Sequence, residues 1–206
     1  MKLSDLKQQL LSLLTANEHV GVFVSGGLDS GLLLYLCCLI KKEYNLPTNI
    51  HIFMVPDPNP KNEDSEVVYA KQVIDWVAKT FNISLKITMV GNPYEHHSKK
   101  IWSGILIARN ICKCLLLGDM TNPEPLANDP HAPIFYSNTV PEVVRPFLNI
   151  TKKEVVALII ELNLIGLMIA TNSCQTYVPI RCGICWSCRE RAWAFEQNNY
   201  EDPGTS

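Results

Sequence analysis

Short apolar runs alternate with longer helical patterns along the first two thirds of this chain. The runs typical of β-strands lie at residues 20–24, 49–55, 83–90 and 114–117. The helical patterns lie at residues 3–16, 31–40, 63–81 and 101–112, and the first of them includes Ser4, a candidate N-cap. Because strands that alternate with helices join through crossover connections, the sequence predicts an α/β fold with a doubly wound parallel sheet.

Length and charge narrow the classes of protein that fit this pattern. The 206 residues are 47% hydrophobic, and 18 basic against 20 acidic residues give a net charge of -2. These values predict a single globular domain over residues 1–206 and disfavour a nucleic-acid partner, which needs an excess of basic residues. No uncharged apolar run reaches about 18 residues, and Asp5 interrupts the first apolar stretch. We expect a cytoplasmic protein with no membrane partner, for which a homodimer is a compatible assembly.

The segment SGGLDS, residues 25–30, lies between the first predicted strand and the helix that follows it. Backbone amides at such a junction, together with the helix dipole, favour a bound anion, and Gly26 and Gly27 allow its close approach. An ordinary strand-to-helix turn is the alternative, although it requires only one glycine and one capping serine. The segment has neither the lysine of a Walker A loop nor the pattern GxGxxG. It is therefore a candidate phosphate-binding loop of a different kind.

Ligands of a doubly wound sheet bind at the carboxyl ends of its strands. The residues expected at that edge are Ser25 to Ser30, Asp57, Gly118 and Asp119. Loops 56–62 and 119–137 belong to the same edge, and the second is too long for an ordinary connection. We expect this second loop to cover a ligand.

A group of four cysteines lies near the end of the chain, with seven, two and two residues between successive members: Cys174, Cys182, Cys185 and Cys188. Four thiolates form a closed tetrahedral zinc site, which has a structural rather than a catalytic role. Two disulfides fit poorly with a cytoplasmic protein, whereas an iron–sulfur cluster is a serious competing interpretation. The spacing predicts a zinc knuckle within residues 171–197. The remaining cysteines are expected to be small buried residues: Cys37, Cys38, Cys112 and Cys114.

SGGLDS resembles the PP-loop of the ATP pyrophosphatases, which cleave ATP to AMP and pyrophosphate. The resemblance implies that the loop, Ser25, Gly26, Gly27, Leu28, Asp29 and Ser30, binds the pyrophosphate of ATP, with Gly118 and Asp119 beside it. It further implies that Asp29 helps to hold Mg²⁺. Asp29, Ser25 and Lys61 are the candidate catalytic residues. Lys61 would neutralise the ATP phosphates, and an exposed, solvated lysine is the alternative.

Two later segments extend the resemblance. RPFLNITKKEV spans residues 145–155, where Thr151 and Glu154 form a capping box before a helix over residues 155–164. NSCQTYVPIRCGICWSCRERAWAF spans residues 172–195 and contains the four cysteines. With the PP-loop, these segments are similar to the 7-cyano-7-deazaguanine synthase family, QueC. That family uses ATP twice to convert 7-carboxy-7-deazaguanine and ammonia first to an amide and then to a nitrile.

Departures from this family leave the substrate open. The chain reads VPDPNPKNEDSE where the family has a DYGQRH-like stretch. The loop TNPEPLANDPHAPIFY, residues 121–136, is also unlike that of the family, so no substrate contacts are inferred in this loop. Arg181 and Arg189 could bind a substrate carboxylate, or they could be solvated beside the last helix. Three alternatives therefore stand beside the QueC reaction: joining a carboxylate to a different amine, tRNA thiolation by a PP-loop enzyme, and a zinc-knuckle assembly module without activity. A thiolation enzyme would need a basic surface and a reactive cysteine outside the group of four.

Overall fold

The computed structural model describes residues 2–55, 65–91, 97–129, 141–174 and 181–204. The strands are β1 (His19–Phe23), β2 (Asn49–Met54), β3 (Lys86–Met89), β4 (Cys114–Leu116) and β5 (Val143–Val144). The helices are α1 (Leu3–Ala16), α2 (Leu28–Glu43), α3 (Ser65–Phe81), α4 (His97–Ala108), α5 (Lys152–Glu161), α6 (Ile165–Ala170) and α7 (Trp186–Glu196). A short 3-10 helix, η1 (Glu124–Leu126), follows β4.

The five strands form one parallel sheet in the order β3-β2-β1-β4-β5. The chain moves outward from β1 to β3 and then returns to place β4 on the other side of β1, so the order reverses between β1 and β4. This reversal is the feature that defines a doubly wound sheet, and sheets of this kind bind ligands at the carboxyl ends of the strands on either side of it, which here are β1 and β4. The predicted fold class is confirmed.

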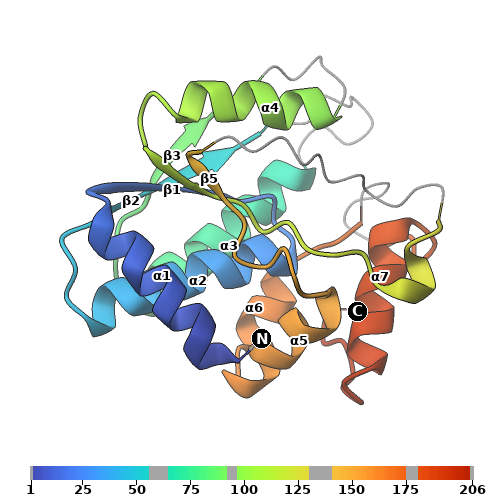
Figure 1. Ribbon diagram of the computed structural model, residues 1–206. Helices are drawn as coiled ribbons and strands as arrows, with labels where there is room; N and C mark the ends of the chain where they lie inside the picture. The colour runs from blue at the N-terminus through green and yellow to red at the C-terminus, as the bar shows by residue number, and fades with distance from the viewer. Residues whose placement is uncertain (1, 56–64, 92–96, 130–140, 175–180, 205–206) are drawn as a thin grey trace.

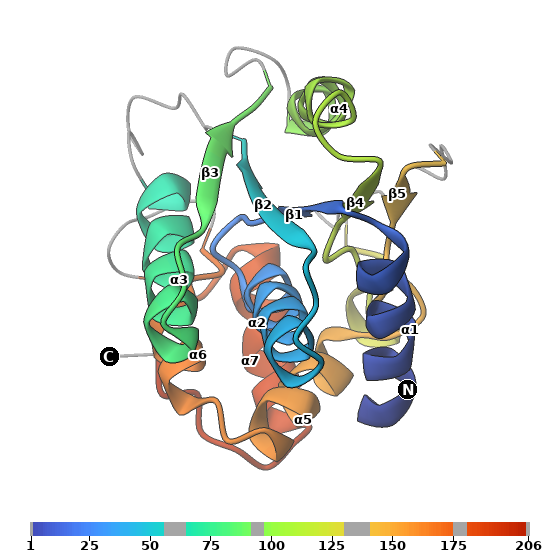
Figure 2. The same cartoon turned by 90° about the vertical axis from the view of Figure 1, so that its left-hand side faces the viewer.

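Helices cover the two faces of the sheet unequally. Figures 1 and 2 show α4 on one face and α1, α2 and α3 on the other, where α5, α6 and α7 add a further layer. The larger apolar core lies on the α2 side, and a smaller one that includes Phe23, Phe53 and Ile105 lies under α4. None of the helices in the described ranges combines the length and the hydropathy of a membrane-spanning segment.

Local signals predicted some helix starts better than others. Thr151 and Glu154 form the predicted capping box, and α5 begins directly after Thr151. Ser4 is not the N-cap of α1, because that helix begins at Leu3 and the Ser4 hydroxyl donates to Asp5 within its first turn. β5 and α6 were not predicted, since segments of two and six residues are too short to display a periodic pattern.

Candidate active site

The predicted phosphate-binding loop connects β1 directly to α2 and is closed by its own hydroxyl groups. The Ser30 hydroxyl accepts from the Ser25 amide at 3.2 Å, lies 3.2 Å from the Ser25 hydroxyl and donates to the Gly27 carbonyl at 3.3 Å. Gly26 has φ +87°, and a Cβ atom there would lie 2.7 Å from the amide nitrogen of Ala70 in α3. Only glycine fits this turn, because a side chain would be strained and would collide with α3.

The first turn of α2 faces the end of the loop with its amide groups uncapped. Gly27 is the N-cap residue, and no side chain makes a capping hydrogen bond there. The first amides of a helix lack partners within the helix, so an uncapped start is a binding site for an anion such as a phosphate group. The Leu28 side chain is fully buried in the core, which leaves its main chain for any such contact.

Gly118 brings the end of β4 against this loop. A Cβ atom on Gly118 would lie 3.0 Å from the amide nitrogen of Ser30 and 3.1 Å from Asp29 Oδ2. The next residue, Asp119, accepts a hydrogen bond from Arg145 Nε at 2.7 Å through its carboxylate. The sequence-predicted residues Ser25 to Ser30, Gly118 and Asp119 therefore meet at the crevice between β1 and β4, although 88 positions separate Ser30 from Gly118.

Sequence reasoning missed Lys152, the first residue of α5. Its ammonium donates to Asp29 Oδ1 at 2.5 Å and lies 3.5 Å from Glu190 Oε2 of α7. Burial alone would lower the pKa of Lys152, but the two carboxylates outweigh burial and raise the pKa above its ordinary value. Lys152 is therefore charged at neutral pH. The capping box located the helix start, but nothing in TKKE distinguished buried Lys152 from exposed Lys153.

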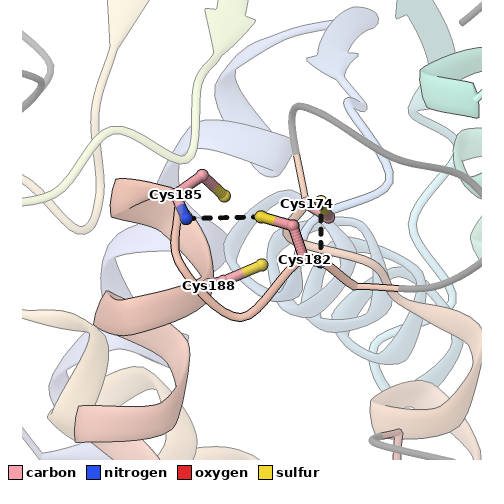
Figure 3. A group of neighbouring side chains, drawn as sticks. All are labelled: Cys174, Cys182, Cys185 and Cys188. Atoms are coloured by element: carbon pink, nitrogen blue, oxygen red, sulfur yellow. Dashed lines mark hydrogen bonds between the residues drawn. The ribbon is translucent and has the colours of Figure 1, made fainter.

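The four C-terminal cysteines come together as predicted, where the chain enters α7: Cys185 is the N-cap of this helix and Cys188 lies in its first turn (Figure 3). Their sulfur atoms all lie within 4.8 Å of one another. A zinc ion about 2.3 Å from each of four tetrahedral thiolates would separate the sulfur atoms by about 3.8 Å, so the group fits a single ion. Two backbone amides donate to sulfur, from Cys182 to Cys174 at 3.4 Å and from Cys185 to Cys182 at 3.3 Å.

Cys182, in the group of four, has a different environment from the four cysteines outside that group. Although burial acts in the opposite direction, the backbone amides of Cys185 and Ile184 lower the pKa of Cys182 to about 6, and a thiol of this kind readily becomes a metal ligand. Cys37, Cys38, Cys112 and Cys114 are almost completely buried. Burial raises the pKa of Cys38 to about 12 and that of Cys112 and Cys114 to about 11, so these thiols stay protonated. The prediction that they are small buried residues is confirmed.

The segment that carries the four cysteines, from Asn172 to Cys188 and called the cysteine segment below, is hydrogen-bonded directly to the candidate phosphate-binding loop. The Asn172 amide donates to the Gly26 carbonyl at 3.0 Å, and the Asn172 side chain accepts from the Cys174 amide at 2.9 Å. On the other side of the segment, the Trp186 indole donates to the Leu126 carbonyl at 3.4 Å, which joins α7 to the loop after β4. The part of this loop that is described therefore packs on the cysteine segment.

The two arginines considered for a substrate carboxylate have partners within the protein. Arg189 donates to Asp129, in the loop after β4. Arg181 donates to the Asp202 carboxylate at 2.6 Å, and the buried Arg191 binds both oxygens of the same carboxylate. These ion pairs hold the end of the chain and α7 in place, so neither arginine is simply solvated. Lys61, Asp57 and the rest of loop 56–62 lie outside the described residues.

Comparisons with known proteins match separate parts of this site. The family model described as queuosine biosynthesis protein QueC matches residues 132–199, which contain the four cysteines and Lys152. The family model described as asparagine synthase matches residues 3–90, which contain the phosphate-binding loop. A search of curated protein sequences finds no match.

A search of solved structures gives matches at low sequence identity. The U34-tRNA thiolase NcsA from Methanococcus maripaludis, solved with its [4Fe-4S] cluster, has a TM-score of 0.50 and 17% identity, and the alignment covers 98% of this chain and 74% of that one. NAD+ synthetase from Burkholderia pseudomallei has a TM-score of 0.47 and 13% identity, over 93% of this chain and 74% of that one. Taken together, the fold, the loop at residues 25–30 and the two family models indicate a divergent relative of the PP-loop ATP pyrophosphatase superfamily.

Proposed function

We propose that this protein is an ATP-dependent ligase of the QueC type, which adenylates a carboxylate such as 7-carboxy-7-deazaguanine and transfers ammonia or another amine to it. One observation carries the proposal. The uncapped start of α2 and the Asp29 carboxylate meet the end of β4 at the sheet crevice, and the cysteine segment matched by the QueC model is hydrogen-bonded to the same loop. The candidate nucleotide-binding loop, residues 25–30, and the segment matched by the QueC model thus contribute to one site.

The reaction follows from what these groups can bind. The loop amides and the hydroxyls of Ser25 and Ser30 would hold the β- and γ-phosphates of ATP, with Asp29 and Asp119 as the carboxylates that would hold Mg²⁺. Bound Mg²⁺ supplies positive charge that stabilises the departing pyrophosphate. An oxygen of the substrate carboxylate attacks the α-phosphorus and displaces pyrophosphate. The amine nitrogen then attacks the acyl carbon, loses a proton and displaces AMP, which leaves an amide.

We further propose that Cys174, Cys182, Cys185 and Cys188 bind one zinc ion with a structural role. The spacing of the four sulfur atoms supports a single ion, because a four-iron cluster binds each thiolate to a different iron atom and needs a wider separation. Four protein ligands leave no open coordination position for a substrate. The ion would instead hold the cysteine segment against the phosphate-binding loop.

tRNA thiolation is the second candidate function, because the thiolase NcsA shares this fold along almost the whole chain. The described cysteines outside the group of four are buried and protonated, which argues against a sulfur-transfer thiol among them. Metal analysis of the purified protein separates the two candidates: the ligase is expected to contain one zinc ion per chain, and the thiolase iron and sulfide.

The decisive experiment supplies the candidate substrates directly. Incubation with ATP, Mg²⁺, ammonia and 7-carboxy-7-deazaguanine is expected to yield AMP, pyrophosphate and a product whose mass corresponds to the amide or the nitrile. If pyrophosphate is released only when another amine is present in place of ammonia, that amine is the nitrogen donor. A parallel incubation supplies ATP, Mg²⁺, tRNA and sulfide, and thiolated tRNA as its product would overturn the ligase in favour of thiolation. No pyrophosphate release in either incubation would favour the assembly module.

A further inference from the structure

Lys152 occupies a position that does not suit a lysine. It is the first residue of α5, where the positive end of the helix dipole disfavours a cation, and its side chain is only 7% exposed. Burial of an ammonium costs free energy unless carboxylates surround it. Thr151 and Glu154 already cap the helix, so α5 itself does not need this lysine. Residues that break local rules in this way are concentrated at functional sites.

The two carboxylates beside Lys152 come from different helices. Asp29 belongs to the first turn of α2 and Glu190 to α7, and the Glu190 side chain is 5% exposed. The ammonium contacts one oxygen of Asp29, Oδ1, while the other oxygen, Oδ2, faces Gly118 at the crevice between β1 and β4. Lys152 thus restrains Oδ1 of the Asp29 carboxylate and leaves Oδ2 available to the expected ligand, Mg·ATP.

We propose that Lys152 is a positioning residue, which holds the Asp29 carboxylate through Oδ1 so that Oδ2 is available to the magnesium ion of Mg·ATP. The proposal rests on the function proposed above and adds a residue to it. Carboxylates that bind metals are themselves held by hydrogen bonds, and removal of such an outer partner typically lowers metal affinity by about 10- to 100-fold. Glu190 balances the charge of Lys152, so the ammonium can remain in place when Asp29 shares its charge with magnesium.

The test compares two neighbouring lysines of the same helix turn. Lys152→Met removes the ammonium but keeps most of the side-chain volume, and Lys153→Met is the matched control, because Lys153 is exposed. Calorimetry measures binding of magnesium pyrophosphate and, separately, of AMP without magnesium. We expect Lys152→Met to weaken magnesium pyrophosphate binding by about 10- to 100-fold with AMP affinity within about twofold of wild type. Lys153→Met should leave both affinities unchanged, and Lys152→Arg should restore part of the loss.

The outcomes separate this inference from the proposed function. Wild-type protein that does not bind magnesium pyrophosphate overturns both. Wild-type binding together with unchanged binding by Lys152→Met overturns only the positioning role, and equal losses for magnesium pyrophosphate and AMP show a structural role instead. If Lys152→Met does not fold, the double variant Lys152→Met with Glu190→Gln removes one charge of each sign, and the same change in magnesium pyrophosphate affinity is expected.

Discussion

Asp29 and Lys152 are 123 positions apart in the chain, yet the Lys152 ammonium lies 2.5 Å from the Asp29 carboxylate. The contact joins the first turn of α2 to the first turn of α5, so it connects the phosphate-binding loop with the C-terminal third of the protein. Glu190 extends the contact into α7, the helix that follows the cysteine loop. The ion pairs of Lys152 with Asp29 and Glu190 therefore join the N-terminal part of the candidate active site to its C-terminal part.

Replacement of the loop carboxylate tests its catalytic role. Asp29→Asn keeps an oxygen that can accept from Lys152 but removes the negative charge needed to hold Mg²⁺. We expect pyrophosphate release to fall by about 100-fold or more, since bound magnesium contributes several kcal/mol of charge stabilisation. The variant should still fold, because Glu190 remains beside Lys152, although the loss of one counter-charge is expected to lower the unfolding temperature. Asp75→Asn, at an exposed position of α3, is the control, and undiminished turnover in Asp29→Asn would refute the assigned role.

A methyl group at Gly118 tests the close approach of β4 to the loop. The Cβ atom of Gly118→Ala would press on the Ser30 amide and on Asp29 Oδ2, at 3.0 and 3.1 Å. We expect a loss of about 1–3 kcal/mol in the free energy of unfolding, together with weaker binding of magnesium pyrophosphate. Gly104→Ala, within α4, introduces a similar crowding against Val90 and Val55 and should leave that binding unaffected. If Gly118→Ala and Gly104→Ala bind magnesium pyrophosphate with equal affinity, the close approach of β4 to the loop does not affect binding of this ligand.

Removal of one clustered cysteine should remove the metal. Cys185→Ala leaves three thiolates, and we expect elemental analysis to show loss of most of the zinc. Because the binding free energy of a structural ion is also folding free energy, a loss of about 3 kcal/mol or more is expected, which corresponds to a drop of roughly 6–12 °C in unfolding temperature. Cys112→Ala, a buried cysteine far from the cluster in the sequence, should keep its metal. A metal-free Cys185→Ala with wild-type stability would contradict the structural role.

The buried carboxylate of Asp202 should make stability depend on pH. Burial acts to raise its pKa, but Arg191 and Arg181 outweigh burial and lower the pKa below its ordinary value. A lowered pKa means that the stabilisation is fully present above the unfolded-state value of about 3.9 and is lost as the pH falls below it.

Asp202→Asn leaves Arg191 buried without its full counter-charge, and the expected cost is about 3–5 kcal/mol in the free energy of unfolding at neutral pH. Chemical denaturation measured from pH 7 to pH 3 should show the difference from wild type shrinking below about pH 4. Glu201→Gln, at the exposed neighbouring position, is the control. A difference that stays constant down to pH 3 would exclude Asp202 as its source.

Features that depend on nearby residues were predictable. The strand-to-helix loop at residues 25–30, the capping box of Thr151 and Glu154, and the group of four cysteines all arise from hydrogen bonding or ligation within short segments. A further local signal was overlooked: α2, α3, α5 and α7 each end near an asparagine with a left-handed backbone, Asn45, Asn82, Asn163 and Asn199. Asparagine tolerates this conformation, so these residues mark the helix ends.

Features that depend on distant residues were not predictable in the same way. Arg189 pairs with Asp129 across 60 positions, and Arg181 and Arg191 share Asp202. The sequence offered Arg181 and Arg189 as candidates for binding a substrate carboxylate, because a guanidinium group suits a carboxylate wherever that carboxylate comes from. Only the tertiary structure, in which α7 packs on α5 and contacts the loop after β4, decides which carboxylate each arginine meets.

The alternation of the longer strands and helices, the glycine loop at residues 25–30 and the group of four cysteines were determined by the sequence itself, since periodicity, glycine conformation and cysteine spacing act over short segments. The tertiary structure decided that Lys152, rather than Lys153, reaches Asp29, and that Gly118 closes the crevice beside it. Coulombic contacts act through space, and in a buried site their partners are selected by how whole helices pack, which no short segment of the sequence encodes.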